Sequence, residues 1–322
     1  MVVFLYADYL SSKNLVTFLP IYIILVIKEG EFMGIEKWFK SNTQSLKGKT
    51  VAITGSTGGL GQELCKLLAR LGADMILVDR NLQRSSAFAK KLIEDYAVAV
   101  ECVTADLEDF QSVKNAASIL SAKDIDIFIH NAGAYSIPRK ICDTGFDNVF
   151  QINFVSPYYM IKTLLPSLKA RKGRVMVVGS IAHNYNKIDE TDIDFSKRTA
   201  SSSVYGNAKR FLMFSLYELF KSESEVKFSV THPGITFTNI TAHYPKLIFA
   251  VIKHPMKIIF MKPRKAVLSL VKGCFENTEF HTWIGPKLFN VWGYPKKQGL
   301  KTCSLTESQR IGEIAEEIFK GL

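Results

Sequence analysis

The sequence has few cysteines and no arrangement of them that would hold a fold together. Five cysteines are scattered through 322 residues, none forms a C-x-x-C pair, and no histidine stands at metal-ligand spacing. These absences speak against a disulfide framework and against a zinc site, so we expect no metal cofactor. Reduced thiols are typical of a cytoplasmic protein, and that is the location we expect.

The chain also lacks a hydrophobic run long enough to cross a bilayer near its N-terminus. Leu15 to Ile27 is apolar apart from Thr17, but it has thirteen residues and contains Pro20, whereas a spanning helix needs about 20. No small-residue cleavage site follows, which speaks against a secretory signal. Residues 1–32 are then either a start assigned too early, with Met33 as the true first residue, or a weak membrane-associating segment. We favour Met33.

No internal repeat, low-complexity tract or Pro/Gly linker divides residues 46–290, so we expect one domain over 33–322. Short apolar runs alternate there with stretches of helical period, such as Leu60 to Leu71. This alternation predicts an α/β fold, a doubly wound parallel sheet in three layers with helices on both faces. We expect strands at 50–54, 75–79, 98–104, 125–130, 174–179 and 227–232.

Positive charge is concentrated in one segment. The chain has a net charge of +11, and residues 236–301 hold eleven Lys and Arg against two Glu, a net charge of +9. Lysines alternate there with apolar blocks, as in "KLIFAVIK", which favours peripheral contact with an anionic membrane. An ordinary solvated face is the alternative. No recognition motif accompanies the charge, so we expect no nucleic-acid partner.

A glycine-rich turn, "TGSTGGLG", follows the first expected strand and leads into a helix. Glycines let the backbone approach a pyrophosphate, whose charge then meets the free N–H groups of the helix N-terminus. Because the turn stands between a strand and a helix, the motif predicts a dinucleotide site. Its candidate residues are Gly55, Ser56, Thr57, Gly59, Leu60 and Gly61.

Two further strand ends supply candidates for the adenosine part of the dinucleotide. Asp79 would accept hydrogen bonds from the ribose hydroxyls and repel a 2′-phosphate, whereas Arg80 would pair with that phosphate. The two signals conflict, and the cost of an unpaired carboxylate beside a phosphate favours NAD over NADP. Asp106, followed by Leu107, is placed to meet the adenine amino group, and its alternative role is the N-cap of the next helix.

The spacing Tyr-x-x-x-Lys occurs four times, at Tyr9, Tyr158, Tyr205 and Tyr217. Residues four apart share a helix face, so any of these pairs could present a phenol and an ammonium together. Only Tyr205 and Lys209 fall between a serine at one strand end, Ser180, and a Pro-Gly pair at the next. This position sets Tyr205 and Lys209 apart from the other three pairs.

The order of these motifs resembles the short-chain dehydrogenase/reductase family over about residues 46–290, and the 25-residue interval from Ser180 to Tyr205 resembles its branch of retinol dehydrogenases and WW-domain oxidoreductase. The resemblance implies a Rossmann-type fold and hydride transfer between NAD(P) and an alcohol, aldehyde or ketone. The motifs that carry it are Thr54-Gly55-x-x-x-Gly59-x-Gly61, Asn131-Ala132-Gly133, Asn153, Ser180, Tyr205-x-x-x-Lys209 and Pro233-Gly234.

The resemblance also implies a role for each catalytic residue. Tyr205 is the acid/base, Ser180 holds the substrate oxygen, and Asn153 anchors a water that connects Lys209 to solvent. Lys209 binds the nicotinamide ribose, and its charge lowers the pKa of the phenol, which is about 10 when free. Cofactor contacts are further implied for Asn131, Ala132, Gly133, Pro233, Gly234 and Thr238.

The substrate side follows from the same resemblance. A lid is expected at about 236–262, and its apolar residues favour a lipophilic substrate. A dimer contact or ordinary core is the alternative role for these residues. The polar insert at 184–203 is expected over the outer rim of the pocket. Many relatives pair through their fourth and fifth helices, which makes a homo-oligomer the expectation. The alternative function is a non-catalytic dinucleotide-binding regulator or membrane-surface protein on the same fold, which the intact Ser180, Tyr205 and Lys209 disfavour.

Overall fold

The computed structural model describes residues 33–235, 261–300 and 302–322. The chain forms two compact units, 1–44 and 45–322. Of the first unit, residues 33–42 are described as a helix, in which the Asn42 amide donates to the Trp38 carbonyl at 2.7 Å. The expectations for residues 1–32, for Thr238 and for all of the lid except Met261 and Lys262 lie outside the described residues.

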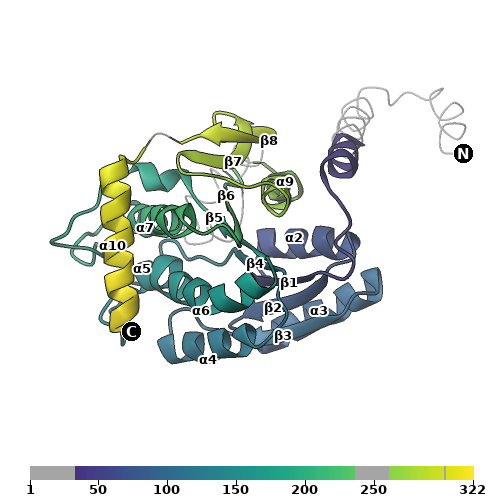
Figure 1. Ribbon diagram of the computed structural model, residues 1–322, viewed down its shortest axis with the longest axis horizontal. Coiled ribbons are helices and arrows are strands. Elements are labelled where there is room, and N and C mark those ends of the chain that lie inside the picture. The colour runs from purple at the N-terminus through teal and green to yellow at the C-terminus, as the bar shows by residue number, and fades with distance from the viewer. Residues whose placement is uncertain (1–32, 236–260, 301) are drawn as a thin grey trace, which may run out of the picture. The chain divides into compact units, whose positions relative to one another are not determined.

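An eight-stranded sheet forms the centre of the second unit, in the order β3-β2-β1-β4-β5-β6-β7-β8 (Figure 1). Neighbouring strands are parallel except β7 and β8, which form an antiparallel hairpin. The six predicted strands are all present within two residues of their expected ends, and β7 and β8 are additional. The strands are β1 (Thr50–Thr54), β2 (Asp74–Asp79), β3 (Val100–Thr104), β4 (Ile127–His130), β5 (Arg174–Val178), β6 (Lys227–Thr231), β7 (Thr282–Leu288) and β8 (Trp292–Gly299).

Helices cover both faces of the sheet, which confirms the three-layer α/β prediction. Among the described helices, α2 packs against α3 and α9 on one face, while α4 packs against α6, and α6 against α7, on the other (Figure 1). The C-terminal helix α10 lies outside this second layer, against α7 and α6. These helices are α2 (Gly59–Arg70), α3 (Leu82–Tyr96), α4 (Phe110–Ser121), α6 (Ser156–Ala170), α7 (Ser201–Lys221), α9 (Pro263–Gly273) and α10 (Leu305–Gly321).

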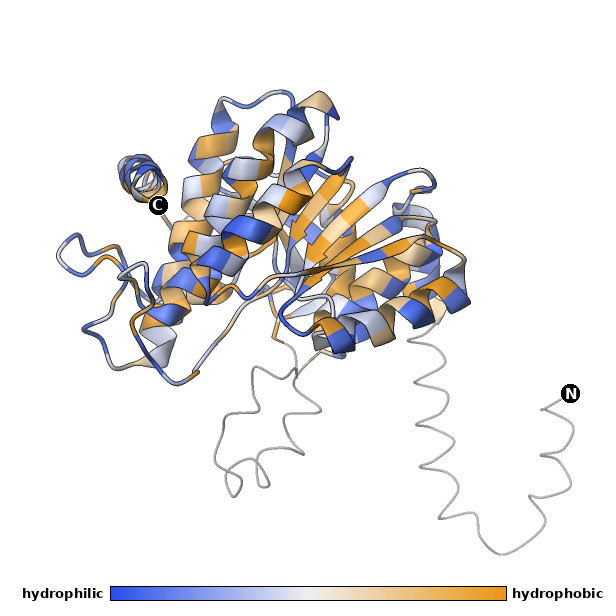
Figure 2. Cartoon of the chain, turned by 90° about the horizontal axis from the view of Figure 1, so that it is seen from below, coloured by the Kyte–Doolittle hydropathy of each residue, from blue (hydrophilic) through white to orange (hydrophobic). Residues whose placement is uncertain are grey.

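The pattern of burial explains why these segments take these forms. The strands are short continuous apolar runs, and Val51, Ala52 and Ile53 of β1 are wholly buried between the two helical layers. The helices are two-faced: α2 buries Leu64 and Leu68 against the sheet. Figure 2 shows the same division, with apolar strands inside and polar stripes on the outer helix surfaces. No described helix combines the length and hydrophobicity that crossing a bilayer would require.

The strand order places the site. The chain moves from β1 outward to β2 and β3, then returns to the other side of β1 to form β4. The segments that follow β1 and β4 therefore leave the sheet in opposite directions, and a crevice opens between them at the carboxyl ends of the strands. The glycine turn follows β1, and the Asn-Ala-Gly motif follows β4.

Candidate active site

The turn after β1 requires glycine at two positions. Gly55 has a φ of +69°, and a Cβ there would lie 2.9 Å from the Ala132 Cα. A Cβ on Gly61 would lie 2.1 Å from the Gly55 carbonyl oxygen. No side chain caps the N-terminus of α2, which begins at Gly59, and its first turn holds no acidic residue. This N-terminus therefore presents free N–H groups to an anion.

A cavity of about 420 Å³ opens beside this turn. Its walls come from the ends of four strands and from the glycine turn, as the sequence predicts. Ser56 does not line the cavity, because it is buried behind the turn. Four other described residues among the predicted cofactor contacts are also absent from the lining: Tyr205, Lys209, Pro233 and Gly234. The lining residues are 54, 55, 57–61, 78–81, 84, 105–108, 131–135, 137 and 152.

Asp79 is turned toward the glycine turn. The Ser56 hydroxyl donates to Oδ2, and the backbone N–H and hydroxyl of Thr57 donate to Oδ1 at 3.2 and 2.9 Å. Both carboxylate oxygens thus accept hydrogen bonds from the turn, and Asp79 is only 7% exposed. Arg80 and Arg84 are exposed and line the same end of the cavity. The Asp79 carboxylate, which the sequence assigns to the ribose hydroxyls of NAD, therefore binds the glycine turn in this structure.

Asp106 and Leu107 both line the cavity, and Asp106 is not a helix cap. The N-cap of α4 is Asp109, whose Oδ1 accepts from the N–H groups of Gln111 and Ser112 at 3.0 and 3.2 Å. Asp106 Oδ1 instead accepts from the Glu108 N–H at 3.0 Å. The alternative interpretation of Asp106 is therefore wrong, and its other carboxylate oxygen is left for a ligand in the cavity.

The Asn-Ala-Gly motif braces the glycine turn from the other side. The Asn131 amide donates to the carbonyls of Thr54 and Gly55 at 3.1 and 3.0 Å. The Ala132 N–H donates to Thr54 Oγ1 at 3.1 Å. A Cβ on Gly133 would lie 2.8 Å from Asn153 Oδ1 and 3.6 Å from Lys209 Nζ. The motif therefore joins the dinucleotide cavity to the predicted catalytic residues.

Ser180, Tyr205 and Lys209 come together at the ends of β5 and α7. Ser180 lies two residues beyond the end of β5 and caps a short 3₁₀ turn, Ile181–Asn184, by accepting from the Ala182 N–H at 3.2 Å. Its hydroxyl also faces the Tyr205 side chain closely enough to lower the pKa of the phenol. Lys209 Nζ lies 5.7 Å from the centre of the Tyr205 ring and donates to the Val178 carbonyl at 3.0 Å.

Burial governs the electrostatics of this pair. It raises the pKa of Tyr205 to about 12, against the lowering effect of the Ser180 hydrogen bond. It lowers the pKa of Lys209 to about 8. The net shift at Tyr205 is opposite in direction to the one the sequence predicts, because removal from water disfavours the phenolate. Near neutral pH both groups carry their protons.

Asn153 is buried in a π-helical turn, Gln151–Val155, between the short helix α5 (Asn148–Phe150) and α6. Such a turn frees a backbone carbonyl, and the Asn153 amide donates to that of Val149 at 2.8 Å. The amide also donates to the Ala134 carbonyl at 2.8 Å, and Oδ1 accepts from the Ala134 N–H. The two Ala134 bonds fix the loop that leads out of Gly133.

Pro233 and Gly234 follow β6, at the same edge of the sheet. Gly234 has a φ of +81°, and a Cβ there would lie 2.6 Å from the Val291 carbonyl oxygen. Glycine is therefore required both by the backbone conformation and by the close approach of the β7–β8 hairpin.

The other Tyr-x-x-x-Lys pairs within the described residues have structural roles. Tyr158 and Lys162 both donate to Glu316 of α10, at 2.5 and 2.8 Å. Tyr217 donates to the Thr282 carbonyl at the start of β7. The two tyrosine hydroxyls therefore bind α10 and β7, and each holds one element of the C-terminal region in place.

Comparison with known proteins decides the family. The model of the short chain dehydrogenase family matches residues 49–246, more than half of the chain. The chain belongs to the short-chain dehydrogenase family. As a member, this dehydrogenase is an oxidoreductase that uses a nicotinamide dinucleotide.

Named relatives place the dehydrogenase in the retinol dehydrogenase branch. It is 30% identical to human retinol dehydrogenase 13 over 285 residues, which cover 86% of this chain and 78% of that one. It is 29% identical to the human WW domain-containing oxidoreductase over 208 residues, 60% of this chain. The matched region spans about half the length of that relative.

Solved structures share the fold. A crystal structure of an uncharacterized protein from Mycobacterium paratuberculosis superposes with a TM-score of 0.69 at 23% identity, covering 87% of this chain and 96% of that one. A short-chain dehydrogenase from Sphingobium yanoikuyae, solved in complex with NADPH, gives a TM-score of 0.54 at 24% identity, covering 69% and 83%. At these identities the likeness concerns the fold alone.

The 184–203 insert of the dehydrogenase reaches further inward than the sequence predicts. Phe195 is 1% exposed and packs in a small apolar cluster with Val149 and Val204, against which Ile137 and Tyr205 lie. The insert therefore packs directly against Tyr205. The single phenylalanine of a mainly polar, acidic stretch is the signal that the sequence offers for this contact.

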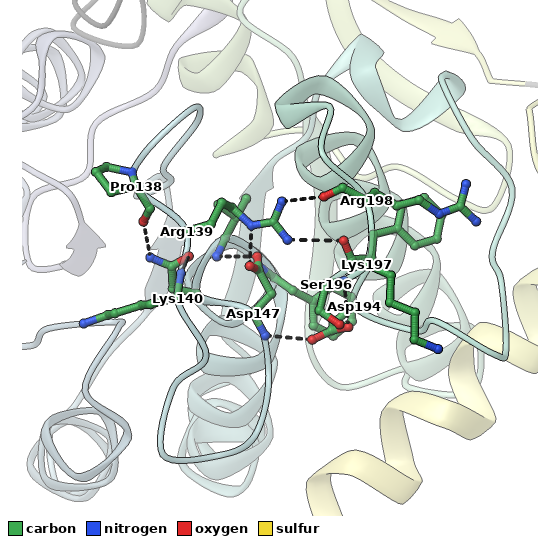
Figure 3. Close-up of polar contacts among 12 residues, drawn as sticks. Pro138, Arg139, Lys140, Asp147, Asp194, Ser196, Lys197 and Arg198 are labelled. Atoms are coloured by element: carbon green, nitrogen blue, oxygen red, sulfur yellow. Dashed lines mark hydrogen bonds and ion pairs between the residues drawn. The ribbon is translucent and has the colours of Figure 1, made fainter.

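Arg139 and Asp147 hold the insert in place, as Figure 3 shows. The Arg139 guanidinium pairs with Asp147 Oδ2 and donates to the carbonyls of Arg198 and Phe195 at 3.1 and 3.2 Å. The Asp147 N–H donates to Asp194 Oδ2 at 2.7 Å. Asp147 Oδ1 also caps α5, which leads into the turn that holds Asn153. We call Arg139, Asp147 and Asp194 the insert clamp, and sequence reasoning did not identify it.

Proposed function

We propose that this dehydrogenase interconverts a lipophilic alcohol and the corresponding aldehyde or ketone, with Tyr205 as the proton donor and acceptor. One observation carries the proposal. The Tyr205 phenol lies between the Ser180 hydroxyl, which lowers its pKa, and the Lys209 ammonium, which stands beside Gly133 at the wall of the dinucleotide cavity.

The residues present fit a dinucleotide. A Cβ at Gly55 would crowd Ala132, and one at Gly61 would collide with the Gly55 carbonyl oxygen, so the turn keeps its shape only with glycine. The uncapped α2 begins at Gly59, within this turn. We propose that this turn holds the pyrophosphate, that Asp106 meets the adenine and that Gly133 and Lys209 face the nicotinamide riboside. When bound, the nicotinamide ring supplies or accepts the hydride.

The protein's own residues then manage the proton. Ser180 and Tyr205 hold the substrate oxygen between them, and Tyr205 gives up its proton as that oxygen gains negative charge. Lys209 stabilises the phenolate left behind, and this effect appears only once the proton has moved. The reverse steps serve alcohol oxidation. Asn153 fixes the loop at Ala134 and thereby the wall against which the substrate lies.

We propose NADP(H) as the preferred dinucleotide, which replaces the preference for NAD based on Asp79. Both Asp79 oxygens accept hydrogen bonds from the glycine turn, so this carboxylate has less capacity to bind ribose hydroxyls. Arg80 and Arg84 line the cavity on that side and supply two cations for a 2′-phosphate.

The cofactor proposal is tested by kcat/KM for NADPH and NADH in the wild type and in Arg80→Ala/Arg84→Ala. We expect the double variant to lose at least about tenfold in kcat/KM for NADPH, since each charge-assisted contact contributes about 1.5 kcal/mol or more, and to change little with NADH. Equal losses with both dinucleotides would contradict the proposal. Lys90→Ala, an exposed cation of α3 outside the cavity lining, is the matched control.

A lipophilic substrate is supported by the described part of the pocket. The Tyr135 ring packs edge-on against Tyr205 with 5.3 Å between ring centres, and Ile137 lies on the same wall. Tyr185, which follows the 3₁₀ turn of Ser180, is 56% exposed. A steady-state panel of short polar, long-chain and polycyclic carbonyls tests this. Higher kcat/KM for the short polar compounds would show the substrate class to be wrong.

The C-terminal helix bears on oligomerisation. The expected pairing would use α6 and α7, the helices that correspond to the fourth and fifth, yet α10 packs against both. Glu316 binds Tyr158 and Lys162 on α6, and Glu307 pairs with Arg210 on α7 at 2.7 Å. We propose that the protein does not pair through this face. A mass measurement by light scattering tests it, and a dimer that dissociates when α6 is altered would contradict it.

A further inference from the structure

The β7–β8 hairpin carries an exposed apolar tip that the dehydrogenase mechanism does not use. Phe289 is 87% exposed, Leu288 53%, Trp292 40% and Tyr294 36%. Leu288 pairs directly with Trp292 across the hairpin, and Tyr294 is two residues further along β8, so these three side chains share one face. We call these four residues the hairpin tip.

The backbone at the tip is unusual for the residue that occupies it. Phe289 and Asn290 have φ values of +53° and +57°, and the Val291 N–H donates to the Leu288 carbonyl at 2.9 Å, which closes a tight turn. Such turns favour glycine and asparagine, whereas a bulky aromatic side chain rarely adopts this conformation. Folding alone does not call for phenylalanine here, so its presence points to a contact outside the molecule.

The turn is also held rigid. The Gln298 amide donates to Asn290 Oδ1 at 2.9 Å and to the carbonyls of Gly285 and Pro286 at 3.2 and 2.9 Å. Beside the turn itself, the close approach of the Val291 carbonyl to Gly234 fixes the position of the hairpin on the segment that follows β6. The backbone that carries Phe289 is therefore held in one conformation, which reduces the entropy lost on docking.

Positive charge surrounds the tip. Lys287 and Lys296 are exposed on the hairpin, and Lys265 of α9 places its Nζ 5.3 Å from the centre of the Tyr294 ring. Lys297 pairs with Glu279 at 3.5 Å. The sequence holds no Asp or Glu between Glu279 and Glu307. Two copies of this tip facing each other would oppose like charges, which disfavours self-association and fits an anionic surface.

We propose that the hairpin tip inserts into the headgroup region of an anionic phospholipid membrane. Phe289 and Leu288 enter the apolar boundary, Trp292 and Tyr294 lie at headgroup level, and the lysines contact lipid phosphates and carboxylates. This is a different part of the basic segment from the lysine-rich stretch at 246–260, which lies outside the described residues.

The topology gives the contact a consequence for catalysis. β7 runs parallel to β6, so its carboxyl end, where the tip begins, lies at the same sheet edge as Ser180 and Gly234. A membrane bound at the tip is therefore close to the substrate side of the site. This consequence rests on the proposed lipophilic substrate, whereas binding of the tip to lipid does not.

The binding test uses the full chain and vesicles of phosphatidylcholine alone or mixed with phosphatidylserine, in a co-sedimentation assay. We expect binding to the mixed vesicles only. Phe289→Gly suits the turn and should not lower thermal stability, yet we expect it to weaken vesicle binding about tenfold. Lys287→Gln and Lys296→Gln should each weaken it about fivefold.

The control variant is Ile119→Ala, which removes an apolar side chain that is 50% exposed on α4, in the helical layer opposite α9. It should bind as the wild type does. Equal binding to both vesicle types, no binding by the wild type, or wild-type binding by Phe289→Gly would each overturn the proposal. So would a dimer that Phe289→Gly abolishes without any vesicle binding. Turnover of a water-soluble carbonyl, measured in parallel, reports on the catalytic proposal separately.

Discussion

The cofactor side and the substrate side of this site are built by different means. On the cofactor side, the turn at Gly55 and Gly61 exists because no Cβ is present, and Asn131 braces it through backbone carbonyls. On the substrate side, Tyr205 is supported by Phe195, which depends on contacts between side chains far apart in the sequence. The shape of the glycine turn follows from the residue type at each position. The packing of Phe195 against Tyr205 instead requires that all the side chains that hold the insert are present.

The largest effect is expected from removal of the proposed proton donor, which lies where the cofactor side and the substrate side meet. Tyr205→Phe should lower kcat by about 10³-fold, within the range for loss of a general acid, while dinucleotide binding is retained. Steady-state kinetics and a fluorescence titration with NADPH measure the two quantities. Tyr158→Phe is the control, because it removes a hydroxyl from another Tyr-x-x-x-Lys pair and should leave kcat unchanged. A kcat for Tyr205→Phe within a few-fold of the wild type would remove the acid/base role.

The next effect breaks the cofactor side alone. Gly61→Ala places a methyl group 2.1 Å from the Gly55 carbonyl oxygen, so the turn must move. Overpacking of this kind costs about 1–3 kcal/mol, and we expect KM for the dinucleotide to rise by at least about tenfold. Gly299→Ala adds a methyl group where no atom lies within 4 Å, so it should change neither the stability of the protein nor KM for the dinucleotide. An unchanged KM in Gly61→Ala would mean that the turn does not hold the dinucleotide.

A smaller effect loosens the substrate side. Arg139→Ala removes the centre of the insert clamp, so Phe195 loses the contacts that hold it against Tyr205. We expect kcat to fall about tenfold with KM for the dinucleotide unchanged, and Arg139→Lys to recover part of it. Arg310→Ala, which breaks an exposed pair with Glu190 of the same insert, should have little effect. Equal changes in KM for the dinucleotide and KM for the carbonyl substrate would instead indicate a general loss of stability.

The smallest effect is a pH dependence. The pKa of Lys209 is lowered to about 8 by burial, so its charge is lost as pH rises through that value. Because the ammonium stabilises the phenolate, kcat/KM for carbonyl reduction should fall several-fold above about pH 8. A profile measured from pH 6 to 10 that stays flat across this window would contradict it.

Folding stability should change in the opposite direction over that window. The unfolded Lys209 has the higher pKa, so between about 8 and 10.5 the unfolded chain binds more protons than the folded one. On this account alone, the free energy of unfolding rises with pH there. Denaturant titrations at pH 8 and 10, compared with those of Lys209→Met, isolate this contribution.

The sequence predicts the parts of the molecule that follow from local pattern. The six apolar runs became β1 to β6, and the glycine turn and Tyr205 with Lys209 lie where their spacing indicates. β7 and β8 were missed, because "TWIGPKL" and "WGYPKKQG" mix glycine, proline and lysine in a way that is typical of loops.

The electrostatic prediction failed for a physical reason. The sequence places an ammonium four residues from a phenol, but it does not show how deeply both are buried, and burial sets the direction of the shift at Tyr205. The insert clamp was missed for a related reason. Asp147 and Asp194 are 47 residues apart in the sequence. Only the folded chain brings the Asp147 N–H within hydrogen-bonding distance of Asp194 Oδ2, at 2.7 Å.

The support of Tyr205 has a consequence for how the enzyme responds to heat. Val149, Phe195 and Val204 form a cluster separate from the large core that surrounds the sheet. A small island of apolar contacts opens at a lower free-energy cost than the body of the molecule. Warming should therefore cause a reversible loss of activity at temperatures where the sheet is still folded, because the Tyr205 side chain is no longer held in position.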